Sequence, residues 1–164
     1  MEIKRILPEN KEKLMNLVNI IENNLENKEF WLPINEVSRQ HFFDDEWTEF
    51  YGVFVGNDLI AAAALFYNEH EYNESLLAIN RRISNVAEIG RAMVHPDYRG
   101  KNILLEINMK LIEVAQKKNI EYLIATIHPD NVASQKSFLK LGMSKQTTYK
   151  KQCGFVRDVF LIKL

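Results

Sequence analysis

The sequence of 164 residues lacks the features that mark several classes of protein. Cys153 is its only cysteine, which excludes an intrachain disulfide and any metal site built from several thiolates. Its histidines, His41, His70, His95 and His128, are scattered without metal-ligand spacing. We therefore expect a protein of a reducing compartment, the cytoplasm, that needs no metal.

Long apolar runs and a surplus of charge are also missing. The longest apolar stretch, Leu59 to Tyr67, is too short to cross a bilayer, and the N-terminal residues lead into no signal-peptide apolar region. Lys and Arg total 21 against 22 Asp and Glu, a formal charge of -1, so no bulk field attracts nucleic acid or an anionic membrane. We expect a soluble protein with neither partner, in which any anion site is local.

The chain does contain enough apolar residues for one well-buried core. They make up 46% of the sequence. No internal repeat and no Gly/Ser-rich or Pro-rich stretch divides the chain. The sequence therefore predicts one domain that spans residues 1–164.

Hydrophobic periodicity predicts a strand, helices and a hairpin in the N-terminal half. Glu2 to Leu7 alternates as a short strand, and an amphipathic helix follows Pro8. Aromatic residues gather between Phe30 and Tyr51 around a second short helix, where composition favours core over a substrate-facing lid. Strands from Phe50 to Val55 and from Leu59 to Tyr67 are joined by a Gly-Asn-Asp turn.

The C-terminal half contains two strand-to-helix units. A polar loop from Asn68 to Ser75 precedes a strand from Val86 to Val94, and a helix follows Pro96. A strand from Tyr122 to Ile127 leads into a helix that Gly142 ends, since glycine accepts the left-handed conformation. Two final strands form a hairpin, Met143 to Lys150 and Phe155 to Leu164.

This order of elements defines the fold class. Strand runs on both sides of two strand-to-helix crossovers predict an α/β (α+β) fold with a mixed, mostly antiparallel sheet of six or seven strands. The crossovers put a parallel pair at the centre of the sheet and helices on both faces. We expect the sheet to splay open at this pair.

The segment Tyr98 to Leu104 has the composition of a pyrophosphate site. It stands at the start of a helix, where backbone N–H groups have no intrahelical partner and the helix dipole favours an anion. Arg99 and Lys101 add positive charge, and Gly100 lets the backbone come close to a ligand. By itself such a loop is equally typical of a solvated helix start.

Two ordered motifs extend this loop. The first runs from Ala87 to Lys101 and contains Val-x-Pro-x-Tyr-Arg-Gly over residues 94–100. The second consists of Asn131, Ser134, Phe138, Leu141, Gly142 and Met143. Together they resemble the strand, the pyrophosphate loop and the downstream helix of the GNAT superfamily of N-acetyltransferases. The resemblance implies the acyl-CoA N-acyltransferase fold.

The same resemblance implies a cofactor and the residues that bind it. Acetyl-CoA, or coenzyme A, would be the co-substrate. Backbone groups of Met93 and Val94 would pair with the pantetheine amides like an added strand. Asn131 would bind the CoA arm, or cap its own helix with Ser134 near the third position. The pyrophosphate would lie on Arg99, Gly100, Lys101, Asn102, Ile103 and Leu104.

Asn102 and Leu104 depart from the family, which has small residues at both positions. Asparagine tolerates left-handed backbone angles, and the main-chain N–H groups that would bind phosphate are retained. Leu104 must turn its side chain into the core, or the cofactor must sit higher and bind more weakly.

Glu88 is the candidate general base. An acceptor amine, with a pKa near about 10, is mostly protonated at neutral pH, so a base or a water relay must remove its proton. The histone-acetylating members that this segment resembles carry their base glutamate at the position of Glu88; the alternative is a solvated strand residue. Phe138 replaces the family's acidic tyrosine, which leaves Tyr149, Tyr98, water or no general acid.

Other candidates have simpler explanations. Arg91, on the opposite face of an ideal strand from Glu88, is expected in a surface ion pair rather than against an acidic substrate, with Glu71, Glu74 or Asp158 as its partner. Cys153 is expected to be a semi-buried thiol. Arg81 and Arg82 meet the CoA ribose phosphate or form a solvated loop.

These observations predict an acetyl-CoA-dependent N-acetyltransferase that moves an acetyl or short acyl group to a primary amine by direct attack in a ternary complex. The acceptor would be a small-molecule or peptide amine, and the chain could form a homodimer. The alternative is a catalytically silent GNAT-fold CoA-binding or regulatory domain, suggested by Asn102, Leu104 and Phe138. A nucleic-acid module ranks last, because it would need a basic face.

Overall fold

A seven-stranded mixed sheet organises the chain in the computed structural model, which describes residues 1–164. The strands lie in the order β1-β2-β3-β4-β5-β7-β6, and β4 with β5 is the one parallel pair. The predicted mixed sheet with a central parallel pair is therefore confirmed. The strands are β1 Ile3–Ile6, β2 Thr48–Val55, β3 Asp58–Phe66, β4 Val86–Val94, β5 Tyr122–Ile127, β6 Ser144–Lys150 and β7 Val156–Lys163.

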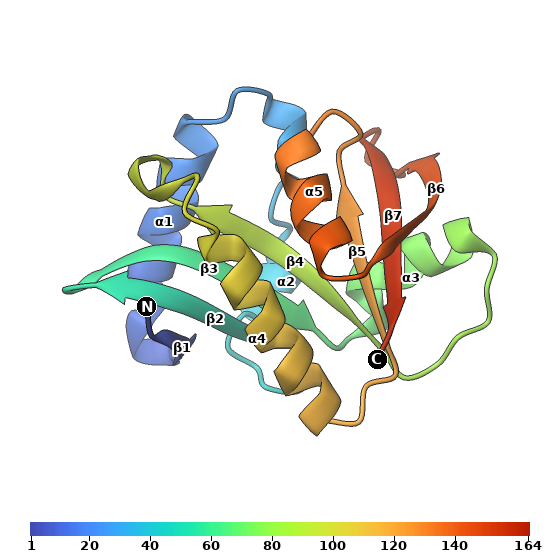
Figure 1. Cartoon of the computed structure of the whole chain (residues 1–164), viewed down its shortest axis with the longest axis horizontal. Helices are drawn as coiled ribbons and strands as arrows, with labels where there is room; N and C mark the ends of the chain where they lie inside the picture. The colour runs from blue at the N-terminus through green and yellow to red at the C-terminus, as the bar shows by residue number, and fades with distance from the viewer.

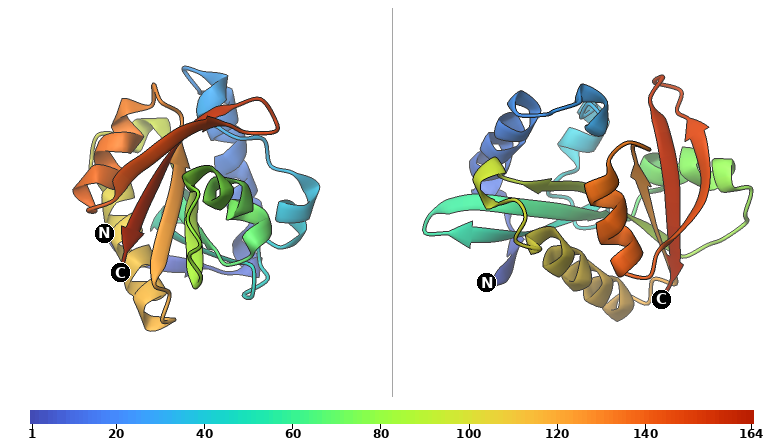
Figure 2. Two further views of the ribbon diagram at one scale, coloured as in Figure 1. Left: turned by 90° about the vertical axis from the view of Figure 1, so that its right-hand side faces the viewer. Right: turned by 45° about the horizontal axis from the view of Figure 1, so that its top comes forward.

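Helices cover both faces of the sheet. Figure 2 (left) shows α4 and α5 on one face and α1, α2 and α3 on the other. None of these helices combines the length and apolarity that a bilayer crossing requires. The α-helices are α1 Lys11–Asn23, α2 Glu36–Gln40, α3 Glu69–Ile79, α4 Ile103–Lys117 and α5 Val132–Lys140.

The alternating side chains of β3 supply both layers of the core. Ala61, Ala63 and Leu65 join the cluster beneath α4, which also contains Ile107 and Leu111. Their neighbours along the strand point to the other face, where α1 packs. Small alanine side chains let both helices approach the sheet closely. The residues on the α1 side include Ala62, Ala64, Phe66, Leu14, Leu17 and Val18.

Turns and caps form where the sequence predicts them. Gly56 adopts a φ of 58° between β2 and β3, which glycine tolerates without steric cost. Gly142 has a φ of 85° just beyond α5 and ends that helix. The hairpin and the helix end are therefore confirmed.

The segment Asn68 to Ser75 is helical, so its assignment to a polar loop is wrong. Asn68 caps α3 by accepting a hydrogen bond from the His70 amide at 3.0 Å. Tyr72 and Ser75, three residues apart, are buried on one helix face, while Asn73 between them is exposed. The polar composition concealed a short surface helix with a narrow buried stripe.

Candidate active site

The parallel pair β4–β5 opens after a short paired stretch. Pairing extends only from Val86 with Tyr122 to Glu88 with Ile124. Figure 1 shows the two strands side by side near the C-terminus of the chain and then diverging, with α5 in front of the opening. Beyond Glu88, the side of β4 that faces β5 therefore has backbone groups with no strand partner. These groups are free to pair with an extended ligand.

A β-bulge in β4 reorients the side chains around this opening. Ala64 pairs with Gly90 and Ala62 pairs with Met93, so two β4 residues oppose Ala63 alone. Arg91 lies in the bulge with a φ of 51°. The bulge brings Arg91 to the same cavity as Glu88, so the prediction of opposite faces, which assumed an ideal strand, is wrong.

A cavity of about 690 Å³ lies at the opening between the strands. Its walls come from the segment between α1 and α2, the end of β3, helix α3, the middle of β4, the end of β5 with α5, and the turn between β6 and β7 with the start of β7. Its charged lining residues are Glu71, Glu74, Glu88, Arg91, Lys151 and Arg157.

Glu88 is a buried carboxyl group at the wall of this cavity, with 9% of the residue exposed. Burial raises the pKa of Glu88 from its ordinary value of 4.5 to about 8, because the ionised form loses solvation. The positive charge of Lys151 acts in the opposite direction, and Glu71 reinforces the rise in pKa. Thr126 donates a long hydrogen bond of 3.5 Å to Glu88 Oε1. The reading of Glu88 as a solvated strand residue is therefore wrong.

Arg91 makes no ion pair, contrary to expectation. Its guanidinium donates hydrogen bonds to the carbonyl oxygens of Leu32 and Pro33 and lies over the ring of Trp31, 5.2 Å from the centroid. The bulge carries the side chain toward the segment after α1 and away from the surface. Trp31, at 9% exposure, serves as core and as cavity wall at once.

The loop before α4 fits an anionic group. Gly100 and Asn102 have φ values of 78° and 57°, and no heavy atom lies within 4 Å of the position that a Cβ on Gly100 would take. The amides at the start of α4 have no intrahelical partner. Arg99 and Lys101 are exposed and make no ion pair, and Lys101 Nζ lies over the Tyr98 ring at 5.0 Å.

The two departures from the family pattern are accommodated here. Asn102 adopts the left-handed conformation that a glycine would adopt. Leu104 is partly buried against the core cluster beneath α4, as is Ile103, which is 2% exposed. Neither side chain blocks the loop.

The start of α5 meets the cavity. Asn131 caps the helix, since its Oδ1 accepts a hydrogen bond from the Ser134 amide at 3.2 Å, and both residues line the cavity. Phe138, 3% exposed, lines it too. Met93 is buried with its backbone paired to Ala62, and Val94 pairs with Ala61.

Tyr149 does not line the cavity. Its hydroxyl lies 2.9 Å from Ser75 Oγ and accepts a hydrogen bond from Lys151 Nζ at 3.0 Å. Lys151 does line the cavity and forms an ion pair with Glu74 at 3.2 Å. Tyr149 is thus one residue removed from the site.

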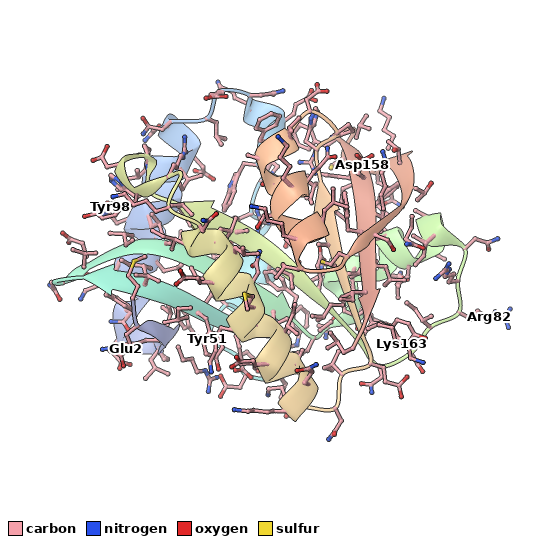
Figure 3. All side chains as sticks on the ribbon, in the orientation of Figure 1. Glu2, Tyr51, Arg82, Tyr98, Asp158 and Lys163 are labelled. Atoms are coloured by element: carbon pink, nitrogen blue, oxygen red, sulfur yellow. The ribbon has the colours of Figure 1, made fainter.

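Cys153 and the pair Arg81 and Arg82 lie at the surface of the molecule. Cys153 is exposed at the cavity rim, so the expectation of a semi-buried thiol is wrong: the turn between β6 and β7 projects from the sheet. Figure 3 shows Arg82 at the opposite end of the molecule from Tyr98, so the pair Arg81 and Arg82 lies far from the loop before α4. Both arginines are exposed.

Sequence reasoning missed several lining residues. Arg157 is 2% exposed and contacts the segment after α1, 128 positions away along the chain, by donating to the Glu29 carbonyl at 2.6 Å. His128, 7% exposed, lies 3.2 Å from Glu29 Oε2. No local motif marks these residues; the one available signal is that Arg157 and Asp158 are charged residues next to the apolar run of β7. No group of three His, Cys, Asp or Glu side chains is arranged to hold a metal ion.

The splayed sheet, the bulge and the anion loop define a class of protein, the acyltransferases with an acyl-CoA N-acyltransferase fold. The sequence profile of the acetyltransferase (GNAT) family matches residues 15–143. The chain therefore belongs to the acetyltransferase (GNAT) family.

Individual relatives agree with the family assignment. The chain is 40% identical over 62 residues to an L-2,4-diaminobutyric acid acetyltransferase of Shouchella clausii (strain KSM-K16), a match that covers 38% of this chain and 35% of that protein. The chain thus spans about a third of that relative's length in the match.

Two solved structures have the same fold. A probable acetyltransferase from Staphylococcus epidermidis ATCC 12228 superposes with a TM-score of 0.74 at 16% identity, covering 99% of this chain and 98% of the other. A ribosomal-protein-alanine N-acetyltransferase from Brucella melitensis gives a TM-score of 0.72 at 17% identity, with 100% of both chains covered. At these identities the likeness concerns the fold alone.

Proposed function

We propose that the protein transfers an acetyl or short acyl group from acetyl-CoA to a primary amine, by direct attack of the amine within a ternary complex. One observation carries the proposal: Glu88 is a buried carboxyl group in the cavity at the splayed strands, with a pKa raised to about 8. A base with this pKa accepts a proton from a bound ammonium ion near neutral pH much better than an ordinary carboxylate does.

Residues for holding acetyl-CoA are available along one path. The backbone amides from Ile103 onward suit a pyrophosphate. Gly100, Asn102 and Leu104 shape the loop, and Arg99 and Lys101 supply positive charge. The free side of β4 at Met93 and Val94 suits the pantetheine amides. Asn131 and Ser134 line the far end. When bound, acetyl-CoA supplies an activated thioester.

The chain's own groups then act on protons and position. Glu88 accepts the proton of the attacking amine, directly or through one water. The departing thiolate is stable near neutral pH and needs little help from an acid. Lys151 is the lining residue that would donate a proton to the thiolate. Its Nζ donates a hydrogen bond to the Tyr149 hydroxyl, so Tyr149 would act by positioning Lys151.

The acceptor is a small-molecule or peptide amine. An amine acceptor is supported by the Shouchella clausii relative, which is named an acetyltransferase of L-2,4-diaminobutyric acid. The alternative, a catalytically silent domain, predicts CoA binding without turnover, or no CoA binding at all.

Calorimetric titration with acetyl-CoA tests the cofactor site. Lys101→Glu puts a negative charge beside the proposed pyrophosphate and should weaken binding by about tenfold or more. Lys117→Glu, at the exposed C-terminal end of the same helix, is the matched control and should bind as the wild type does. If both variants bound acetyl-CoA with the same affinity, the pyrophosphate would have to bind elsewhere.

Initial-rate kinetics test direct attack. With amine and acetyl-CoA varied together, a ternary complex gives intersecting double-reciprocal lines, whereas a covalent acyl-enzyme gives parallel lines. Parallel lines, or tight acetyl-CoA binding with no turnover on any amine, would overturn the proposed mechanism.

A further inference from the structure

Two arginines in the cavity have no carboxylate partner. Arg157 is among the largest fully buried side chains of the protein, at 2% exposure, and Arg91 is partly buried; both line the cavity with Glu88. Neither forms an ion pair, although the other cationic lining residue, Lys151, is paired with Glu74. A buried guanidinium without a counter-ion destabilises the folded protein, which indicates that these two arginines serve a binding role.

Backbone carbonyls hold both guanidinium groups in place. Arg157 donates to the carbonyls of Val156 at 2.7 Å and Glu29 at 2.6 Å, and Arg91 donates to those of Leu32 and Pro33. Each guanidinium has five N–H donors, so each keeps donors for another acceptor. The side chains are therefore fixed in position and incompletely satisfied, as in a preformed anion site.

The electrostatics agree with an anion site that awaits its ligand. Loss of solvation lowers the pKa of Arg91 and of Arg157. The charges of Glu71 and Glu88 oppose this shift at Arg91 without cancelling it, and the like charge of Arg157 adds a smaller lowering of the Arg91 pKa. A ligand carboxylate between them would offset both effects.

The same cavity also carries negative charge. Glu71 and Glu74 come from α3, and Glu71 accepts a hydrogen bond from the buried Ser38 of α2, which fixes its carboxylate. A dianion such as phosphate would be repelled by these groups, and a simple amine would leave the arginines unpaired. A ligand with one charge of each sign matches both halves of the lining.

We propose that the acceptor is a zwitterionic amino acid, whose carboxylate binds Arg91 and Arg157 while its amine faces Glu88. This assignment rests on the proposed function and names its substrate class. The bound ammonium group gives one proton to Glu88, and the neutral amine attacks the thioester carbonyl carbon. The carbon–sulfur bond then breaks, and the second amine proton passes through water to the departing thiolate. CoA therefore leaves as the thiol, and Glu88 returns its proton to solvent.

Pairs of acceptors that differ only in the carboxylate provide the test. Lysine against cadaverine, ornithine against putrescine, and alanine against ethylamine are compared by release of the CoA thiol. For the pair that contains the best acceptor, kcat/KM should favour the amino acid by at least about tenfold, the value of a charge-assisted hydrogen-bonded pair. Equal kcat/KM within every pair would overturn the proposal while leaving the transferase function intact.

Variants assign the effect to the two arginines. Arg91→Gln and Arg157→Gln should raise KM for the amino acid by about tenfold or more and change KM for the amine little. Arg157→Lys, which keeps the charge but loses the fork, covers the case that the glutamine variant misfolds. Arg39→Gln, an exposed arginine of α2 outside the cavity, should match the wild type. An equal loss on both acceptors would indicate a purely structural role.

A binding measurement separates the substrate class from turnover. N-acetyl-lysine and N-acetyl-cadaverine are titrated into the protein saturated with CoA, and melting temperature is recorded. Stabilisation by the carboxylate-bearing compound alone, lost in Arg91→Gln, supports the carboxylate site even if no acceptor is turned over. Stabilisation by neither compound, together with no preference in the kinetic pairs, sinks the proposal.

Discussion

Glu88 shows how one residue's chemistry depends on the residues that surround it. A strand residue with a carboxylate would normally face water and titrate near 4.5. Here Phe66 and Ile124 pair with Glu88 on the two neighbouring strands, and the resulting burial gives it a pKa of about 8. The carboxylate is thus the major form only above about pH 8, but it is a much stronger proton acceptor than an ordinary carboxylate.

Glu88→Gln should reduce kcat by about 10²-fold or more, because glutamine cannot accept a proton. In the wild type, kcat/KM should rise with pH and level off above about 8, apart from the acceptor's own titration. The pH–rate profile of the variant should lack this inflection and keep only that of the acceptor. Glu69→Gln, an exposed residue of α3 outside the cavity, is the control. Identical profiles for wild type and Glu88→Gln would remove Glu88 from the chemistry.

At the scale of elements, short local devices orient the parts of the site. The bulge in β4 carries Arg91 into the cavity, and the Asn131 cap fixes the first turn of α5 at the opening between β4 and β5. Each device depends on one residue in a particular conformation.

Removal of the α5 cap should lower the free energy of unfolding by a measurable amount. Asn131→Ala removes the acceptor for the Ser134 amide and should lower the free energy of unfolding by about 1 kcal/mol. Asn131→Asp keeps an acceptor at a helix N-terminus and should stay close to the wild type. Urea denaturation followed by circular dichroism gives both values. A loss of equal size in both variants would show that the cap is not the cause.

At the scale of the whole molecule, the buried site makes stability depend on pH. The pKa of Glu88 is higher in the folded state than in the unfolded chain, so the folded protein retains a proton that the unfolded chain has released. The stability associated with protonated Glu88 is fully present below about 4.5 and is lost as pH rises toward about 8. Above that range both states are ionised and the dependence ends.

Glu88→Gln should remove this dependence. Between pH 5 and pH 8, the free energy of unfolding of the wild type should fall relative to the variant by an amount on the order of a few kcal/mol. Urea titrations of both proteins at each pH measure the difference, and the other titrating groups cancel because they are common to both. Parallel curves would mean that Glu88 titrates as an exposed carboxyl group.

Sequence patterns were sufficient for the elements and for the anion loop. The apolar run of β3, the helical spacing in α4 and the left-handed positions at Gly56 and Gly142 each follow from local physics, because a few neighbouring residues determine them. The Val-x-Pro-x-Tyr-Arg-Gly stretch predicted the loop before α4, since phosphate binding by backbone amides needs only a contiguous segment. A short helix at Glu69–Ile79 escaped detection, because few of its residues are buried.

The cavity and its charges were decided by tertiary structure. Arg91 reaches the cavity that Glu88 lines only through the bulge in β4, where the register of the pairing with β3 shifts. Arg157 and Glu29 meet across 128 positions of chain, and the pKa of Glu88 depends on burial by separate strands. The amino-acid sequence by itself determined the family fold and the glycine-containing loop proposed to bind pyrophosphate, because the physics of both is local. Only the folded molecule determined which charges share one cavity, because desolvation and long-range contact depend on groups that are far apart in the chain.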